Sequence, residues 1–460
     1  MKLIFDVQDR PKGGQLVIFA LQQMLAILAA TIAVPVIIGN GMSSAAAMFG
    51  AGVGTLVYIM FTRRKSPVFL GSSFAFIGSM SAAFAGGVSM ELGMLGLIIG
   101  AFAAGLIYVL IAAIVKKVGV GWLNKLMPPV VIGPTVAIIG LSLAGNAVGD
   151  FQTGDVKTIN SAGESVMAAS PYAAMICGLV TLAVVMLCST YGKKMMKLLP
   201  FVIGIIAGYG CASIMTLIGN AAGIDSLKII DFSVFESYMF DGGVSLKTFI
   251  SVPDLVFLKA IKGTGELTAS YLLMIIVAYV PVALVCFAEH VADHKNLSSV
   301  IERDLLTDPG LSATLMGDGI GSIAGAFFGG CPNTTYGESV GCVAITKNAS
   351  IVTIIAAAIG CILSSFFTPF VAFIDSIPAC VMGGVCIALY GFIAVSGLKM
   401  LKEVDLDDNR NLFTASVILI AGIGGLSISF SSVTITEVAA ALILGILTNV
   451  MLSKKAPSEK

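Results

Sequence analysis

The stretch from Tyr271 to His294 reads YLLMIIVAYVPVALVCFAEHVADH, an apolar run that ends in a cluster of ionisable side chains. A helix needs about 20 apolar residues to cross the hydrocarbon core of a bilayer, so this stretch predicts a transmembrane helix. It contains both histidines of the chain, His290 and His294, next to Glu289 and Asp293. Because ionisable groups inside a hydrophobic span are costly, they mark a candidate functional site.

The composition predicts a polytopic membrane protein whose main surroundings are the lipid bilayer. Hydrophobic residues make up 57% of the 460 residues and charged residues 11%, whereas a soluble domain carries about 25% charged residues. The net charge of zero argues against nucleic acid as a partner. The nine cysteines are mostly isolated in apolar segments, which is typical of small core residues rather than disulfides or metal ligands.

Apolar segments of membrane-spanning character recur along the whole chain, and their spacing predicts an all-α fold with fourteen transmembrane segments. Lysine and arginine gather in alternate loops, and positive charge favours the cytoplasmic side. This alternation predicts that both termini are cytoplasmic, with a tail that begins near Lys454. The predicted spans are 15–38, 45–61, 68–84, 92–115, 130–148, 172–189, 198–217, 271–294, 313–328, 332–346, 352–373, 377–395, 412–427 and 433–452.

Two similar segments indicate that the chain is an inverted repeat. Met127 to Gly133 reads MPPVVIG and opens the fifth span, and Ile377 to Gly383 reads IPACVMG and opens the twelfth. The two lie seven spans apart, and because seven is odd the two halves have opposite orientations in the membrane. A seven-plus-seven inverted repeat of this kind is typical of secondary transporters.

Spans three and ten are short and irregular, and they also lie seven spans apart. Gly71 to Gly78 reads GSSFAFIG, and Pro332 to Gly341 reads PNTTYGESVG. Non-helical backbone at membrane depth is tolerated where it lines a cavity or packs in protein. We therefore expect short extended pieces that cross in mid-membrane, each followed by a half-helix whose backbone N–H groups point at a substrate.

Glu289 and Glu338 are the strongest candidates for substrate contact. A carboxylate on each of two facing elements can accept two N–H donors from a flat heterocycle, and Phe74 or Tyr336 can stack on its face. His290 and Asp293 are interpreted as leaving the membrane at the end of the span. His294 lies one and a half turns beyond Glu289, where it could relay a proton to or from that carboxylate.

Two other classes of function stay open at this point. His290 and His294 have the i, i+4 spacing of a zinc pair, which would suit an intramembrane hydrolase. The segment lacks the His-Glu-x-x-His order of a metalloprotease helix, and the chain has no third histidine. We therefore expect no metal, no cofactor and no enzymatic activity. The other alternative is a facilitator for a small neutral solute, which would transport without accumulation.

Several segments together resemble the nucleobase–ascorbate transporter (nucleobase:cation symporter) family, and look most like its bacterial uracil-transporting members. The two signature regions are AEHVADH at 288–294 and NTTYGESVGCVAITK at 333–347. GSSFAF at 71–76, the Ala29-Ala30-Thr31 stretch and DLLTDPG at 304–310 look alike too, so the likeness covers essentially the whole chain. The resemblance implies a core domain at 1–117 (spans one to four) and 270–373 (spans eight to eleven). The gate domain is then 118–218 (spans five to seven) and 374–460 (spans twelve to fourteen and the cytoplasmic tail), with 219–269 as an extracytoplasmic loop.

The same resemblance implies proton-coupled uptake of uracil across the cytoplasmic membrane by alternating access, in a homodimer formed through gate spans. Glu289 and Glu338 would accept the uracil N–H groups, and His294 would pair with Glu289 and take part in proton coupling. Backbone N–H groups would come from Phe74 and Gly337, and the pocket would be lined by Ala30 and Tyr336.

The chain departs from the family pattern at two positions. The first span usually carries Gln-His, whereas Gln22-Gln23 stands here, and the asparagine that usually follows the signature acid is Ser339. Purine-transporting relatives tend to have glutamine where Glu338 stands, so the resemblance favours uracil, with a xanthine or other purine symporter as the alternative.

Overall fold

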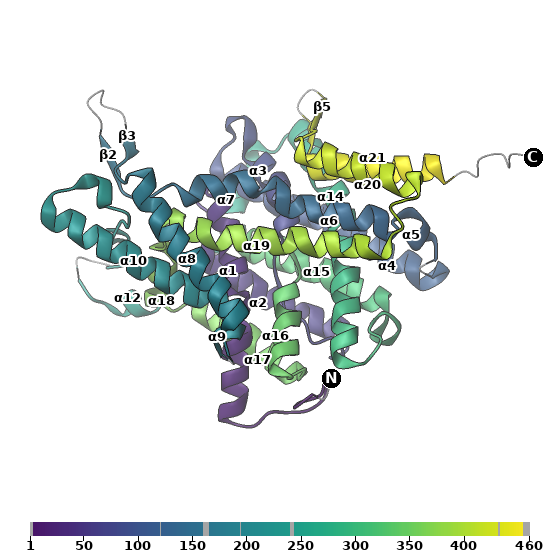
Figure 1. The fold of residues 1–460 in the computed structure, drawn as a ribbon, viewed down its shortest axis with the longest axis horizontal. Coiled ribbons are helices and arrows are strands. Elements are labelled where there is room, and N and C mark those ends of the chain that lie inside the picture. The colour runs from purple at the N-terminus through teal and green to yellow at the C-terminus, as the bar shows by residue number, and fades with distance from the viewer. Residues whose placement is uncertain are drawn as a thin grey trace, which may run out of the picture.

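The computed structural model describes residues 3–119, 121–159, 165–193, 195–239, 243–430 and 433–453, and it is mostly helical (Figure 1). The tail predicted from Lys454 onward lies outside these ranges. The first half of the chain forms α1 Gly14–Ile38, α2 Ser44–Phe61, α3 Ile77–Ala83, α4 Met90–Val118, α5 Gly121–Leu126, α6 Pro129–Ser142, α7 Ala144–Phe151, α8 Pro171–Tyr191, α9 Met195–Leu198 and α10 Pro200–Ala222. The second half forms α11 Val234–Ser237, α12 Leu246–Phe249, α13 Val256–Ala260, α14 Ala269–Ile301, α15 Leu311–Gly329, α16 Gly337–Thr346, α17 Ile351–Ser365, α18 Thr368–Asp375, α19 Ala379–Met400, α20 Asn409–Ile423 and α21 Glu437–Leu452.

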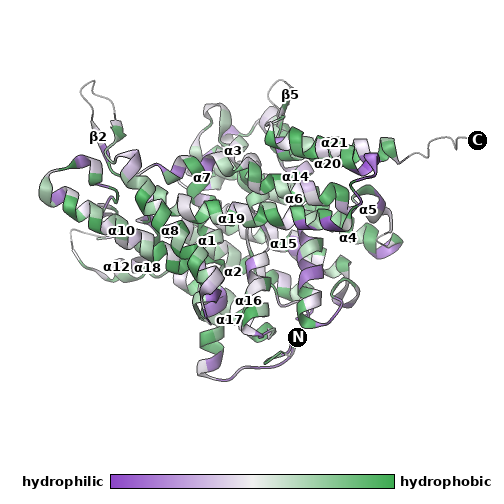
Figure 2. Ribbon diagram, in the orientation of Figure 1, coloured by the Kyte–Doolittle hydropathy of each residue, from purple (hydrophilic) through white to green (hydrophobic). Residues whose placement is uncertain are grey.

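Nine helical stretches in the described ranges are long and apolar enough to cross a membrane, and Figure 2 shows hydrophobic residues along most of the long helices. α6 and α7 together form one of these stretches, Pro129–Phe151. Shorter apolar helices occur at Phe74–Gly87, Ile351–Ser365, Asn409–Ile423 and Glu437–Leu452. The prediction of a helical chain with many apolar spans is thus confirmed, whereas the count of fourteen and the inverted repeat stay predictions.

One group of helices packs through small residues. α2 and α4 both lie against α15, α17 lies against α1 and α2, α14 lies against α4, and α16 lies against α1 and α14. A Cβ atom placed on Gly105 of α4 would lie 2.7 Å from the carbonyl oxygen of Gly319 in α15, and one placed on Gly50 of α2 would lie 3.0 Å from the backbone nitrogen of Gly329. Glycine at these positions lets the backbones approach closely, which is the usual way that membrane helices associate.

A second group consists of α6, α8, α10, α19, α20 and α21. α6 and α19 run side by side across the view in Figure 1. Their approach again depends on glycine, because a Cβ atom on Gly133 would lie 2.9 Å from the carbonyl oxygen of Gly397. The division of the chain into core and gate domains stays a prediction, and we refer below to these helices as the first group and the second group.

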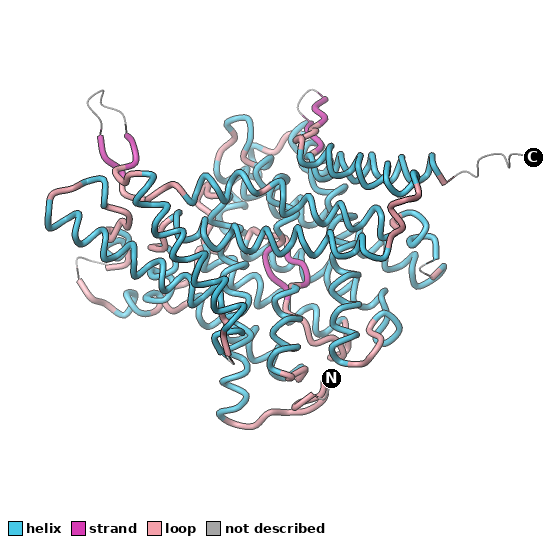
Figure 3. The backbone as a smooth tube through the Cα atoms, viewed as in Figure 1, coloured by secondary structure: helices cyan, strands magenta, loops and turns pink. Residues whose placement is uncertain are grey.

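Two short strands cross at the centre of the molecule, as the sequence predicts for spans three and ten. β1 (Leu70–Ser72) pairs antiparallel with β4 (Asn333–Thr335), and Gly71 lies opposite Thr334 (Figure 3). Every residue of both strands is buried. The short helix η1 (Phe74–Phe76) and then α3 follow β1, and α16 follows β4. Pairing the strands satisfies backbone groups that would otherwise be unbonded in an apolar interior.

Two further two-stranded sheets lie away from the centre. β2 (Lys157–Ile159) pairs with β3 (Ser165–Met167), and β5 (Ile428–Phe430) pairs with β6 (Val433–Ile435), both antiparallel. They form hairpins beside the second group of helices (Figure 1).

Two of the connections between the two groups of helices lie next to each other. The connection from α10 to α14 contains α11, α12 and α13, and the connection from α17 to α19 contains α18. The hydroxyl of Tyr238 donates to Asp375 Oδ2 at 2.6 Å, and the backbone N–H of Ser251 donates to the carbonyl oxygen of Phe366 at 3.1 Å. The two connections are therefore bonded to each other.

Candidate functional site

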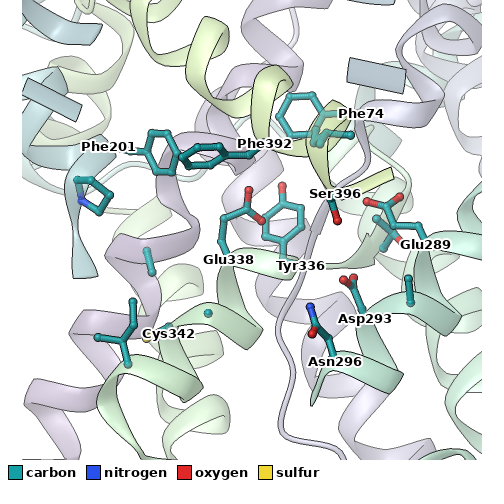
Figure 4. A pocket seen from close by; sticks show the side chains of 18 of the residues that line it. Phe74, Phe201, Glu289, Asp293, Asn296, Tyr336, Glu338, Cys342, Phe392 and Ser396 are labelled. Atoms are coloured by element: carbon teal, nitrogen blue, oxygen red, sulfur yellow. The ribbon is translucent and has the colours of Figure 1, made fainter. Parts of the chain in front are cut away.

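A cavity of about 360 Å³ lies beside the crossing of β1 and β4. Residues from α1, α14, β4 and α16 form one side of it, and residues from α10 and α19 form the other (Figure 4). The cavity is thus placed between the two groups of helices. Its lining includes Ala26, Ser72, Phe74, Lys197, Phe201, Glu289, Asp293, Asn296, Thr334, Tyr336, Gly337, Glu338, Phe392 and Ser396.

Three carboxylates line this cavity. Glu289 and Asp293 are four positions apart on α14, which places them one above the other on the same face of the helix. Glu338 is the second residue of α16. Figure 4 shows Glu338 beside the ring of Tyr336, with Glu289 and Asp293 across the space from it. The structure therefore brings together the two glutamates that the sequence singles out.

The N-terminus of α16 opens into the same cavity. Gly337 is the first residue of this helix, and it is exposed. The first N–H groups of a helix have no partner within the helix, and they carry partial positive charge. This end of α16 can therefore bind a carbonyl oxygen or an anionic group of a ligand.

Asp293 contacts the crossing strand as well as the cavity. Thr335 Oγ1 of β4 donates to Asp293 Oδ2 at 2.8 Å, and a Cβ atom on Gly337 would lie 3.6 Å from Asp293 Oδ1. That Asp293 leaves the membrane at the end of the span stays a prediction, although the helix itself does not end there. α14 continues to Ile301, so Asp293 lies well inside a long helix rather than at its end.

His290 is buried within the protein, and it does not reach the cavity lining. Its side chain is fully buried, with Nδ1 2.7 Å from Asp318 Oδ2 and Nε2 3.0 Å from Thr314 Oγ1. Both partners belong to α15. The predicted span ends at His294, seven residues before the end of α14 at Ile301, whereas the position of His290 relative to the membrane stays a prediction.

His294 points away from the cavity. Five positions from Glu289 correspond to a rotation of about 140° around the helix, which turns the ring toward α2. Nδ1 of His294 donates to the carbonyl oxygen of His290 at 2.8 Å, and Nε2 lies 2.7 Å from the hydroxyl of Tyr58. The described structure thus contains no hydrogen bond between His294 and Glu289, and the expected pair is not formed.

Both ring nitrogens of His290 and of His294 have hydrogen-bond partners, which disfavours the zinc-pair alternative. The two rings lie against each other with centroids 4.0 Å apart. In the part of the chain that the structure describes, no group of three or more histidine, cysteine, aspartate or glutamate side chains could hold a metal ion.

The aromatic candidates lie at the cavity, whereas one small residue does not. The ring of Phe74 meets the ring of Tyr390 from α19 edge-on, with centroids 5.7 Å apart. The hydroxyl of Tyr336 donates to the carbonyl oxygen of Ser72 at 2.9 Å, which ties the start of α16 to β1. Ala30 is buried but does not line the cavity, and Ala26, one turn earlier on α1, takes that place.

Sequence reasoning missed several lining residues. The spacing i, i+4 and i, i+7 from Glu289 points to Asp293 and Asn296, so these two could have been found. Phe201, Phe392 and Ser396 come from α10 and α19. They lie in apolar segments without any distinguishing motif, and only the packing of the second group brings them to the site.

Known proteins provide an independent comparison. The sequence pattern of a family described as "Permease family" matches residues 14–429. The uracil permease of Bacillus caldolyticus is 39% identical over 455 residues, which cover 98% of this chain and 95% of that protein. The uracil permease of Escherichia coli K12 is 34% identical over 449 residues, covering 96% and 92%. The transmembrane domain of the cyanobacterial bicarbonate transporter BicA superposes with a TM-score of 0.61 at 13% identity, covering 95% and 96%, and so shares the fold.

Proposed function

Because the chain belongs to this permease family, it is a multi-pass membrane transporter and not an enzyme, and we propose that it takes up uracil together with protons. The observation that carries the proposal is the pair of glutamates, Glu289 and Glu338, facing one cavity from two different elements. The relatives named uracil permease support the choice of substrate.

The proposed binding mode matches each polar group of uracil to a group in the cavity. Glu289 and Glu338 accept the two N–H groups of the base. The backbone N–H groups at the start of η1 and α16, those of Phe74 and Gly337, donate to its two carbonyl oxygens because the first N–H groups of a helix have no intrahelical partner. Tyr336 lies beside Glu338 and offers an aromatic surface to the flat ring.

For proton coupling, the geometry favours Glu289 together with Asp293. Two carboxylates one helical turn apart in a poorly solvated cavity repel each other, and a shared proton relieves this repulsion. A proton on this pair would also remove the cost of moving an anion through the membrane. A relay through His294 would need a path around α14, since that ring is bonded to Tyr58 on the far side.

Alternating access supplies the transport cycle in this proposal. The cavity lies between the two groups of helices, and the exposed Lys197 of α9 lies at its edge. We propose that the two groups rock against each other, with the cavity open to the cytoplasm in the present conformation. The protein would lie in the cytoplasmic membrane with both termini inside, as a homodimer through the second group of helices.

Uptake of labelled uracil into proteoliposomes tests the proposal. We expect an inward proton gradient to drive accumulation that excess xanthine does not reduce. Equilibration without accumulation would support a facilitator instead. Competition by xanthine would support a purine symporter, because Glu338 would then not select against purines. No uracil entry under any gradient would refute the proposed function.

A further inference from the structure

Three core elements meet at the hydroxyl group of Ser339. The side-chain amide nitrogen of Gln23 on α1 donates to Ser339 Oγ. The backbone N–H of Phe69, just before β1, donates to the same oxygen at 2.9 Å. Gln23 is 2% exposed, and Phe69 and Ser339 are fully buried. Water cannot easily replace a lost partner here, so each of these hydrogen bonds matters more than one at the surface.

The hydroxyl group of Ser339 extends the hydrogen bonding between β1 and β4 past the point where the backbone of α16 can supply an acceptor. The backbone N–H of Tyr336 donates to the carbonyl oxygen of Phe69 at 3.1 Å. Beyond this bond the chain turns into α16, and its carbonyl groups are directed along the helix. The N–H of Phe69 then has no strand carbonyl to bond to, and Ser339 Oγ accepts it instead. Phe69 thus holds the chain on both sides of Glu338.

We propose that Ser339 and Gln23 act as a positioning pair for Glu338 and for the N-terminus of α16. This proposal rests on the proposed function, because Glu338 is the group whose direction matters for the substrate. Ser339 is the third residue of α16, directly after Glu338, so its anchoring to α1 and β1 fixes the first turn of the helix. An error of about 1 Å in such a turn is enough to weaken a paired hydrogen-bond contact.

The pair also explains why the chain departs from the family pattern at two positions. Gln23 stands where the resemblance leads us to expect histidine, and Ser339 where it leads us to expect asparagine. In the structure these two side chains are hydrogen-bonded to each other. A shorter side chain at 339 meets a longer, flexible amide from α1, so we infer that the two departures compensate one another and should be changed together.

The positioning pair predicts a specific kinetic pattern. Ser339→Ala removes the acceptor from both donors and should raise KM for uracil by about tenfold or more, with kcat changed by less than about threefold. Gln23→Leu removes one donor and should raise KM less. The double variant should be no worse than Ser339→Ala, since both changes break the same contact. Ser339→Thr keeps the hydroxyl oxygen and should restore part of the affinity.

The closing experiment combines uracil uptake with amide hydrogen exchange of the ligand-free protein. Exchange should increase at 66–72 and 336–342 in Ser339→Ala. The matched control is Ser350→Ala, another fully buried serine of the first group, whose hydroxyl donates to the carbonyl oxygen of Asp9 at 2.6 Å far from the cavity. The control should change neither KM nor exchange in these two segments.

Two results would overturn the inference. One is that Ser339→Ala matches Ser350→Ala in both measurements, and the other is that the effects of Gln23→Leu and Ser339→Ala on KM are additive in energy. If Ser339→Ala does not fold, the KM and the hydrogen exchange of Gln23→Leu alone test the proposal, because this variant leaves the bond between Phe69 and Ser339 intact. If the wild type takes up no uracil, the proposed function fails, and the exchange pattern still decides whether the pair holds the first turn of α16.

Discussion

Glu289 and Asp293 lie one helical turn apart on α14 and line the same cavity, while His294, the very next residue, is turned away toward Tyr58. Neighbouring residues of α14 therefore differ in their access to the cavity: Asp293 lines it, whereas His294 is buried against α2. We therefore expect the carboxylates of the cavity, rather than His294, to contact the substrate.

Replacing either glutamate of the cavity should abolish uracil accumulation. In Glu289→Gln or Glu338→Gln an amide N–H replaces an acceptor oxygen, so one N–H group of uracil loses its partner. We expect kcat/KM in proteoliposomes to fall on the order of 100-fold. Glu266→Gln, at an exposed position in the connection before α14, is the control and should match the wild type. Normal uptake by either cavity variant would exclude that glutamate from the site.

Asp293→Asn should abolish gradient-driven accumulation of uracil while leaving uracil counterflow largely intact. The amide keeps the size of the side chain and can still accept from Thr335, but it cannot carry the transported proton. Uracil counterflow in the absence of a gradient should stay within about threefold of the wild type, whereas gradient-driven accumulation should disappear. Retained accumulation would mean that Asp293 is not the coupling group.

His294→Asn should affect stability more than coupling. The variant loses the bond to Tyr58 in a fully buried setting, where a hydrogen bond contributes about 0.5–1.5 kcal/mol, while the Tyr58 hydroxyl keeps its bond to Ser66 Oγ at 2.7 Å. Thermal unfolding in detergent should therefore occur at a lower temperature, while proton-driven accumulation per folded molecule persists. If accumulation is lost while counterflow is intact, the result would support the hypothesis of a proton relay through His294.

A disulfide between α3 and the residue before α21 should stop transport. A Cβ atom on Gly78 of α3 would lie 3.6 Å from the Cβ atom of Thr436, just before α21. Disulfides need a Cβ–Cβ distance of about 3.5–4.5 Å, so this pair suits one. Oxidised Gly78→Cys/Thr436→Cys should lose uptake and recover it with reductant, and neither single variant should respond. Full activity of the oxidised protein would contradict movement between α3 and α21.

Asp155, which lies outside the membrane spans, should make the thermal stability of the protein depend on pH. Its Oδ1 accepts from the backbone N–H of Ala379 at 3.1 Å. Burial disfavours the charged form and raises the pKa of Asp155 from 3.8 to about 6. Since the folded state holds this proton more tightly than the unfolded state, the contribution is fully present below about pH 4 and is lost as pH rises through about 6. Asp155→Asn should flatten this part of the thermal stability profile, whereas the exposed Glu266→Gln should leave it unchanged.

The position of the candidate site could be predicted from the sequence better than the local geometry of the site. GSSFAFIG and PNTTYGESVG were short and polar enough to predict the crossing strands, and isolation in apolar surroundings identified Glu289 and Glu338. Helical spacing relates the side chains of α14 to one another, but the neighbours of His290 and His294 could not be predicted, because they depend on how α14 packs against α15 and α2. The bond between Gln23 and Ser339 could not be predicted either, since the two departures from the family pattern lie 316 positions apart and nothing in the sequence shows that they meet.

The bonding of Tyr238 to Asp375, and of Ser251 to Phe366, has a consequence for how the molecule can move. Two of the three connections between the helix groups, from α10 to α14 and from α17 to α19, are hydrogen-bonded to each other, so we expect neither to move alone; the third runs from α4 through α5 to α6. If the two groups rotate against each other, as we propose, we expect the displacement to be smallest at these two bonded connections. The hydrogen bonds of Tyr238 and Ser251 should then persist in every conformation of the proposed cycle.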